Sequence, residues 1–185
     1  MSEKITGRLR CSKCGEGFTT EAWSSINVAT DPELKAKVIS GEVFLAECPH
    51  CGAKTMMQHQ LLYIDPGEKV IVWLTDGKEE TISKARSLFE TELSDYTCRL
   101  VDDAGSLMEK VKIFDAGLDD AIMDMCKYVT RQEMGRDDLE LKFLGLNDSD
   151  GSIIFAYPSK GKMEMTAVGF NVYEDCRRIK LNPRR

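Results

Sequence analysis

The sequence contains one five-residue pattern twice, as CSKCG at residues 11–15 and as CPHCG at residues 48–52. Two intervening residues bring the sulfur atoms of each pair within reach of one metal ion. The glycine after the second cysteine accepts backbone angles that other residues resist, so backbone amides can turn toward the sulfurs. Two such loops supply four thiolates, which complete the tetrahedral coordination of Zn²⁺. The predicted ligands are Cys11, Cys14, Cys48 and Cys51.

Iron is the alternative metal, because rubredoxins use a similar pair of loops to hold one iron for electron transfer. Rubredoxins are far shorter than this chain of 185 residues, so the similarity is confined to the loops. A thioredoxin-type redox pair is a further alternative, although it needs only one C-x-x-C loop. A closed site of four sulfurs leaves no coordination position for water and therefore predicts a structural role.

Two histidines lie near the second loop and are weighed as replacement ligands. His50 lies between Cys48 and Cys51, and His59 follows in the segment that leaves the loop. Because four cysteines already fill a tetrahedron, we interpret His50 as an exposed loop residue and His59 as a strand residue. The remaining cysteines are scattered, and we interpret them as core thiols. They are Cys98, Cys126 and Cys176.

Composition and charge limit the location and the partners of the protein. No stretch of the sequence resembles a signal peptide or a membrane span, so we expect a cytoplasmic protein with reduced thiols and no membrane partner.

The formal charge of −6 resides in residues 61–185, because acidic and basic side chains balance in residues 1–60. A net-acidic chain repels phosphate backbones, which disfavours general nucleic-acid binding. The basic residues that form an alternative nucleic-acid surface near the loops are Arg8, Arg10, Lys13 and Lys54.

The apolar periodicity predicts an α+β protein, whose first module covers residues 1–76. This module is expected to be a zinc-ribbon-like β module, because strand-forming segments flank both cysteine loops. A short helix is predicted between Asp31, as its N-cap, and Gly41, as its end. The apolar run KVIVWL at 69–74 predicts a strand that is covered on both faces. The charged, glycine-containing segment TDGKEE at 75–80 is the expected boundary.

The second module, residues 79–185, is predicted to contain two helices and an antiparallel sheet. Apolar residues keep helical spacing within 82–93 and again within 118–129. The segment before the second of these helices opens with Ser106 and Glu109, which have the spacing of a capping box. Because the module has apolar surfaces of its own, a fragment of residues 79–185 is expected to fold without metal. Alternating or continuous apolar runs predict strands at 139–143, 152–157 and 162–173.

The first 130 residues resemble the CpXC domain family, a bacterial and archaeal family named for its paired cysteine motifs. The resemblance runs through CSKCG, WSSINVATDPELKAKVISGEVFLAECPHCGAK, LLYIDPG and LMEKVKIFDAGLDDAIMDMCKYV. It implies that the four predicted ligands are the family's cysteines, with Ser12 where the family name implies proline. The resemblance supports metal binding and implies no reaction.

No catalytic motif accompanies the cysteine loops, since the sequence has neither a Gly-rich phosphate loop nor a G-x-S-x-G turn. We therefore expect a non-enzymatic, zinc-stabilised interaction or regulatory module, whose partner is a protein rather than a nucleic acid. The alternatives are rubredoxin-like electron transfer by iron and nucleic-acid binding through the ribbon.

Overall fold

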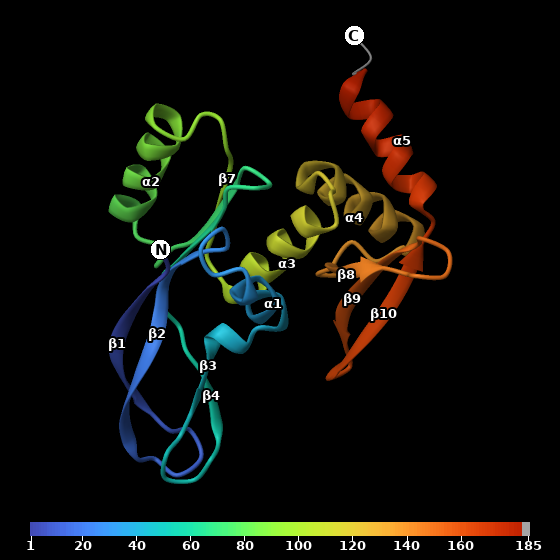
Figure 1. Cartoon of the computed structure of the whole chain (residues 1–185). Helices are drawn as coiled ribbons and strands as arrows, with labels where there is room; N and C mark the ends of the chain where they lie inside the picture. The colour runs from blue at the N-terminus through green and yellow to red at the C-terminus, as the bar shows by residue number, and fades with distance from the viewer. Residues whose placement is uncertain (183–185) are drawn as a thin grey trace. The chain divides into compact units, whose positions relative to one another are not determined.

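The computed structural model describes residues 1–182 and has a mixed α+β fold (Figure 1). It divides into two compact units, Met1–Val111 and Lys112–Arg185. The first unit contains β1 (Glu3–Arg10), β2 (Gly17–Asn27), α1 (Glu33–Ser40), the 3-10 turn η1 (Glu42–Phe44), β3 (Leu45–Glu47), β4 (Lys54–Met56), β5 (Leu61–Asp65), β6 (Val70–Leu74), α2 (Glu79–Thr91), β7 (Thr97–Val101) and the start of α3 (Ala104–Asp115). The second contains the end of α3, α4 (Asp120–Met134), β8 (Lys142–Leu146), β9 (Ile153–Ser159), β10 (Lys162–Val168) and α5 (Phe170–Leu181). None of the helices described is both long and apolar enough to cross a membrane.

A five-stranded sheet of order β1-β2-β5-β6-β7 organises the first unit. The pairs β1–β2 and β5–β6 are antiparallel, whereas β2–β5 and β6–β7 are parallel. Ile71 and Val72, which point to opposite faces of β6, are both almost completely buried. This confirms the prediction that the apolar run of β6 is covered on both faces.

The sheet continues past the charged segment at 75–80 that was expected to end the first module. The chain leaves β6, forms α2, and returns as β7, whose residues pair in register from Thr97 beside Val70 to Val101 beside Leu74. The compact units therefore divide between Val111 and Lys112, not near residues 76–79. A glycine-containing polar loop leads from β6 into α2 here, and such a loop looks the same in sequence as a domain linker.

The ends of α1 agree with the sequence at one terminus and differ at the other. Gly41 ends the helix with a φ of 80°, as predicted. Asp31 was predicted to cap its start, but Pro32 is the N-cap residue and no side chain caps it. The carboxylate of Asp31 instead accepts hydrogen bonds from the Ser2 amide at 3.1 Å and from the Thr30 hydroxyl at 2.8 Å.

The second unit has an antiparallel sheet of order β10-β9-β8, which confirms the predicted sheet type. Phe143 of β8 and Phe155 of β9 are directly opposite each other and buried. Helices α4 and α5 complete this core with Met123, Cys126 and Cys176. The core lies entirely within residues 113–176, so the second unit has its own hydrophobic interior.

The residues from 79 to 182 form four helices, whereas the sequence predicted two. Gly117, with a φ of 69°, separates α3 from α4, and the Asp119 carboxylate caps α4 by accepting hydrogen bonds from the amides of Ala121 and Ile122.

The capping-box prediction at Ser106 is also wrong, because α3 begins at Ala104. The Asp103 carboxylate accepts the Ser106 amide at 2.8 Å and so occupies the capping role.

The segment 170–173, predicted as part of a strand, opens α5 instead. Tyr173 and Cys176 lie one helical turn apart and are both buried in the core of the second unit. Helical spacing therefore buries the apolar residues of this segment better than a continuation of β10 would.

Candidate metal centre

The first cysteine loop connects β1 to β2 and has the hydrogen bonds of a tight metal knuckle. The amide of Cys11 donates to the Glu16 carbonyl at 2.9 Å, and the amide of Gly15 donates to the Cys11 carbonyl at 3.0 Å. Gly15 has a φ of 78°, in the left-handed region that favours glycine. These contacts close the loop so that both of its sulfur atoms lie on one side.

The second cysteine loop connects β3 to β4 and repeats this geometry. The amide of Cys48 donates to the Ala53 carbonyl at 2.9 Å, and the amide of Gly52 donates to the Cys48 carbonyl at 2.9 Å. Gly52 has a φ of 69°. The duplicated sequence pattern is therefore a duplicated backbone structure. We call the two loops together, residues 11–16 and 48–53, the knuckle end.

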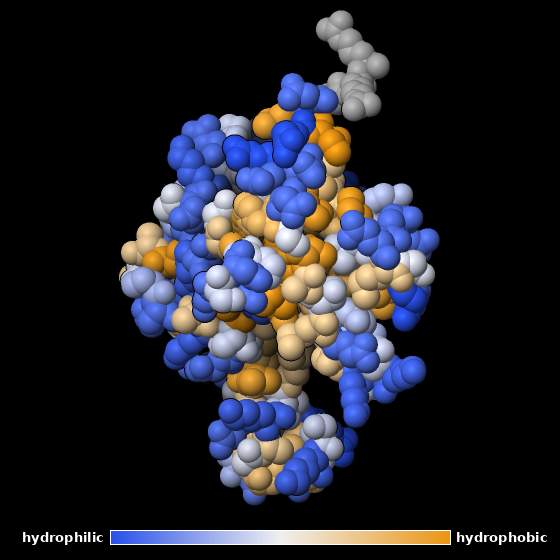
Figure 2. All heavy atoms as spheres, turned by 90° about the vertical axis from the view of Figure 1, so that its right-hand side faces the viewer, coloured by the Kyte–Doolittle hydropathy of each residue, from blue (hydrophilic) through white to orange (hydrophobic). Residues whose placement is uncertain are grey.

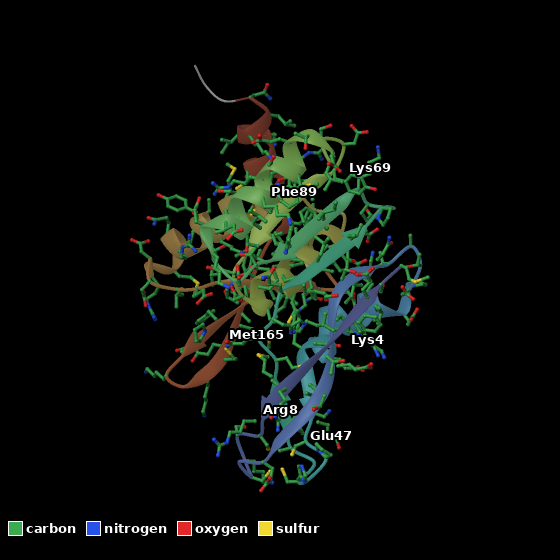
Figure 3. All side chains as sticks on the ribbon, turned by 90° about the vertical axis from the view of Figure 1, so that its left-hand side faces the viewer. Lys4, Arg8, Glu47, Lys69, Phe89 and Met165 are labelled. Carbon is green, nitrogen blue, oxygen red and sulfur yellow. The ribbon has the colours of Figure 1, made fainter. Side chains whose placement is uncertain are left out.

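The fold brings the four predicted ligands together from two separate hairpins. Their sulfur atoms all lie within 4.8 Å of one another, at one end of the first unit (Figure 3). The Sγ atoms of Cys11 and Cys51 are 3.6 Å apart, and those of Cys14 and Cys48 are 3.7 Å apart. A tetrahedron with Zn–S bonds of about 2.3 Å has edges of about 3.8 Å. The observed distances thus suit one tetrahedral metal ion, and the cluster can hold a metal.

A small apolar layer supports the cysteines from the side of the sheet. Cys11 and Cys48 are 2% and 1% exposed, and they pack with Phe18, Met57 and other apolar side chains of the first unit. The cysteine pattern does not identify Phe18 or Met57 as residues of the site. Phe18 is the second residue of β2, and Met57 directly follows β4.

Electrostatics in the cluster favours a cation. The amides of Cys14 and Lys13 hydrogen-bond the Cys11 sulfur and lower the pKa of Cys11 to about 6. The Glu16 amide lowers the pKa of the Cys14 thiol, but partial loss of hydration and the neighbouring sulfurs outweigh it and raise that pKa to about 12. Sulfurs this close compete for the same negative charge. A bound divalent cation removes the competition because it stabilises every thiolate.

The two histidines lie outside the cluster of sulfur atoms. His50 is an exposed residue of the second loop, as predicted. The prediction that His59 is a strand residue is wrong, because it lies in the connection between β4 and β5. The His59 Nε2 donates a hydrogen bond to the Trp23 carbonyl at 3.0 Å. The centroids of the His59 and Phe44 rings are 5.9 Å apart. Burial lowers the pKa of His59.

The remaining cysteines are not members of this cluster. Cys126 and Cys176 are buried in the core of the second unit, which confirms their interpretation as core thiols, and Cys98 on β7 is partly buried. Among residues 1–182, no second group of three or more cysteine, histidine or acidic side chains brings its ligand atoms this close.

The candidate nucleic-acid residues are exposed, but acidic groups lie among them. Arg10 donates from Nε to the Gly15 carbonyl at 2.9 Å and so braces the first loop. Lys54 lies directly opposite Glu47 in the β3–β4 register. Arg8 and Glu47 both lie toward the knuckle end in Figure 3. The surface is therefore of mixed charge.

The loop glycines give a prediction about the backbone of the knuckles. Gly52→Ala should lower the stability of the first unit by about 1–2 kcal/mol, because an L-residue is strained at its positive φ. Gly7→Ala is the matched control, since Gly7 lies in β1 without a positive φ and a Cβ there meets nothing within 4 Å. Thermal unfolding of both variants measures the effect. Equal melting temperatures for Gly52→Ala and the unmodified chain would contradict it.

Comparison with known proteins identifies one family. The family model described as CpXC protein matches residues 9–127. The matched region includes all four clustered cysteines and extends beyond the first unit into α4. No curated protein and no solved structure matches the chain.

Proposed function

The chain belongs to the CpXC family, and from this premise we propose that it binds one zinc ion through Cys11, Cys14, Cys48 and Cys51. The observation that carries the proposal is the spacing of the sulfur atoms, 3.6 and 3.7 Å across the two loops. These values agree with the edge of about 3.8 Å of a zinc–sulfur tetrahedron.

Zinc is favoured over iron by the intrinsic affinities of the divalent ions. At a given set of ligands, Zn²⁺ binds more tightly than Fe²⁺, and four thiolates suit its tetrahedral preference. Rubredoxin-like electron transfer by iron is the alternative, because the same ligand set accepts iron.

The proposed role of the zinc is structural. Its ligands come from the β1–β2 loop and the β3–β4 loop, which belong to different sheets. The apolar cluster at this end contains few buried side chains besides the cysteines. Structural zinc contributes about 10–16 kcal/mol in small metal-bound units, so the ion would be the main link between the two hairpins.

With four thiolates bound, the zinc has no open position for water or substrate, which supports a non-enzymatic role. We propose a cytoplasmic interaction or regulatory module that presents the exposed residues of its two loops to a protein partner. Lys13, Pro49 and His50 are among these exposed residues. Figure 2 shows hydrophilic residues over much of the end of the first unit that carries the two loops.

Cobalt substitution tests the proposed ligand set. Co²⁺ bound to four thiolates in a tetrahedron gives intense visible absorption, so titration of the metal-free chain should produce a coloured one-to-one complex that excess Zn²⁺ bleaches. A spectrum typical of octahedral Co²⁺ with oxygen ligands would reject the four-cysteine site.

The acidic balance of the chain predicts weak binding to nucleic acid. We expect no general affinity for duplex DNA at physiological salt, because the formal charge is −6 and the basic side chains near the loops are mixed with acidic ones. Fluorescence anisotropy with unrelated duplexes measures this affinity. Salt-sensitive binding at micromolar protein that Arg8→Ala and Lys13→Ala weaken would favour nucleic-acid binding through the ribbon.

A further inference from the structure

A cavity of about 610 Å³ lies within the first unit, and none of the four clustered cysteines lines it. Two of its walls are the turns that follow the parallel strands β6 and β7, at Thr75–Gly77 and Asp102–Gly105. The third wall is the connection from β4 to β5. In open sheets, ligands bind outside the carboxyl ends of parallel strands, where the connecting loops diverge. Both the place and the volume are therefore those of a small-molecule site.

One part of the cavity wall is apolar and adaptable. It consists of the side chains of Met56, Met57 and Met108 together with Leu74. Met57 and Leu74 are buried, whereas Met56 is 59% exposed. Methionine side chains are flexible and polarizable, and they make favourable contacts with aromatic rings. This part of the wall suits the apolar body of a ligand, including an aromatic one.

The other part of the wall is acidic. Asp76 follows β6, and Asp102 and Asp103 follow β7, so three carboxylates are at the strand ends. The described residues that line the cavity include no lysine or arginine. His59 also lines the cavity, and burial lowers its pKa, so it adds no positive charge at neutral pH. Lys78 offsets the charge of Asp76, so the preference of this wall for a cation over an anion rests on Asp102 and Asp103.

Local hydrogen bonds hold two of these aspartates at their positions. Asp76 pairs with Lys78 at 2.9 Å, and Lys78 is not part of the lining. Asp103 accepts the Ser106 amide at the start of α3. Asp76 and Asp103 are thus held by their own turns before any ligand arrives, which reduces the entropy lost on binding.

From this lining we propose that the cavity binds a small organic cation, with its ammonium group near the aspartates and its apolar body on the methionines. None of the four cysteines lines the cavity, although Met57 belongs both to its wall and to the apolar layer beside the cysteines. An anion of the same size and shape is rejected by the carboxylates, and a neutral analogue gains only the apolar contacts.

Three isosteric probes test this proposal on the full chain: 4-phenylbutylammonium, 4-phenylbutanol and 4-phenylbutyrate. At constant ionic strength, NMR titration should give saturable shifts of the Met108 methyl group and of the Gly77 and Gly105 amides with the ammonium probe. The alcohol should bind more weakly, and the carboxylate most weakly of the three. Equal binding of the ammonium and the carboxylate, or shifts scattered over the surface, would overturn the proposal.

A charge-neutral variant tests the acidic wall separately. Asp102→Asn should weaken binding of 4-phenylbutylammonium about fivefold and leave binding of 4-phenylbutanol unchanged. Asp95→Asn is the matched control, because it removes the same charge from an exposed residue of the same unit that does not line the cavity. If both substitutions weakened binding of 4-phenylbutylammonium equally, the attraction would come from the general surface charge of the protein. That result would refute the proposed site.

Discussion

Cys51→Ser should lose its zinc to a mild chelator and loosen the knuckle end, whereas His50→Ala should keep its zinc. Cys51 contributes one of four sulfur atoms that lie within 4.8 Å of one another, while the neighbouring His50 is exposed and outside the cluster. Structural zinc contributes about 10–16 kcal/mol in small metal-bound units, and whole domains are stable by only about 5–15 kcal/mol. Removal of one thiolate should therefore cost a large part of the stability of the knuckle end.

The measurement is zinc per chain in both variants after the same chelator wash, together with amide NMR spectra. In Cys51→Ser, signals of Phe18 and Ala46 should shift or broaden, because these residues pack beside the cysteines. Signals of the second unit, such as Phe155, should be unchanged, since its core contains none of the four cysteines. Loss of zinc from His50→Ala with retention in Cys51→Ser would show that the ligand set is wrong.

A fragment of residues 112–185 should fold alone without metal. Its core of buried side chains lies entirely within residues 113–176, and it contains the complete β10-β9-β8 sheet with α4 and α5. An additional tie between these helices comes from Lys180, whose Nζ is 2.6 Å from the Asp119 carboxylate. We expect a dispersed amide NMR spectrum and cooperative thermal unfolding.

The longer fragment 79–185 is the informative comparison. It includes α2 and β7, but β7 pairs with β6, which this fragment lacks. Residues 79–111 should therefore give poorly dispersed signals, whereas the signals from 112 onward should match those of the shorter fragment. A folded 79–185 with a featureless 112–185 would instead place the independent unit where the sequence first suggested it.

The candidate metal centre could be predicted from sequence because its geometry is local. Each loop is closed by hydrogen bonds within six residues, such as that from the Cys11 amide to Glu16, and its glycine follows the second cysteine directly. The spacing of the cysteines therefore carries most of the information. The apolar support from Met57 was missed, because nothing local distinguishes it from the exposed Met56 before it.

The division of the chain could not be predicted in the same way, because it depends on pairing between distant residues. The polar segment after Leu74 reads as a linker, and only the parallel pairing of β7 with β6 shows that one sheet continues. Helix boundaries failed for a related reason. Ser106 has the spacing of a capping box, yet Asp103 takes that role, and both residues are common helix caps.

Elemental analysis of the purified chain, combined with its visible absorption spectrum, tests the central proposal most directly. A structural zinc site of four cysteines predicts one zinc per chain and a colourless protein, because Zn²⁺ has a filled d shell. One iron per chain with strong visible absorption would contradict the zinc assignment and establish the rubredoxin-like alternative. A chain purified without chelators that binds neither metal would contradict the metal centre itself.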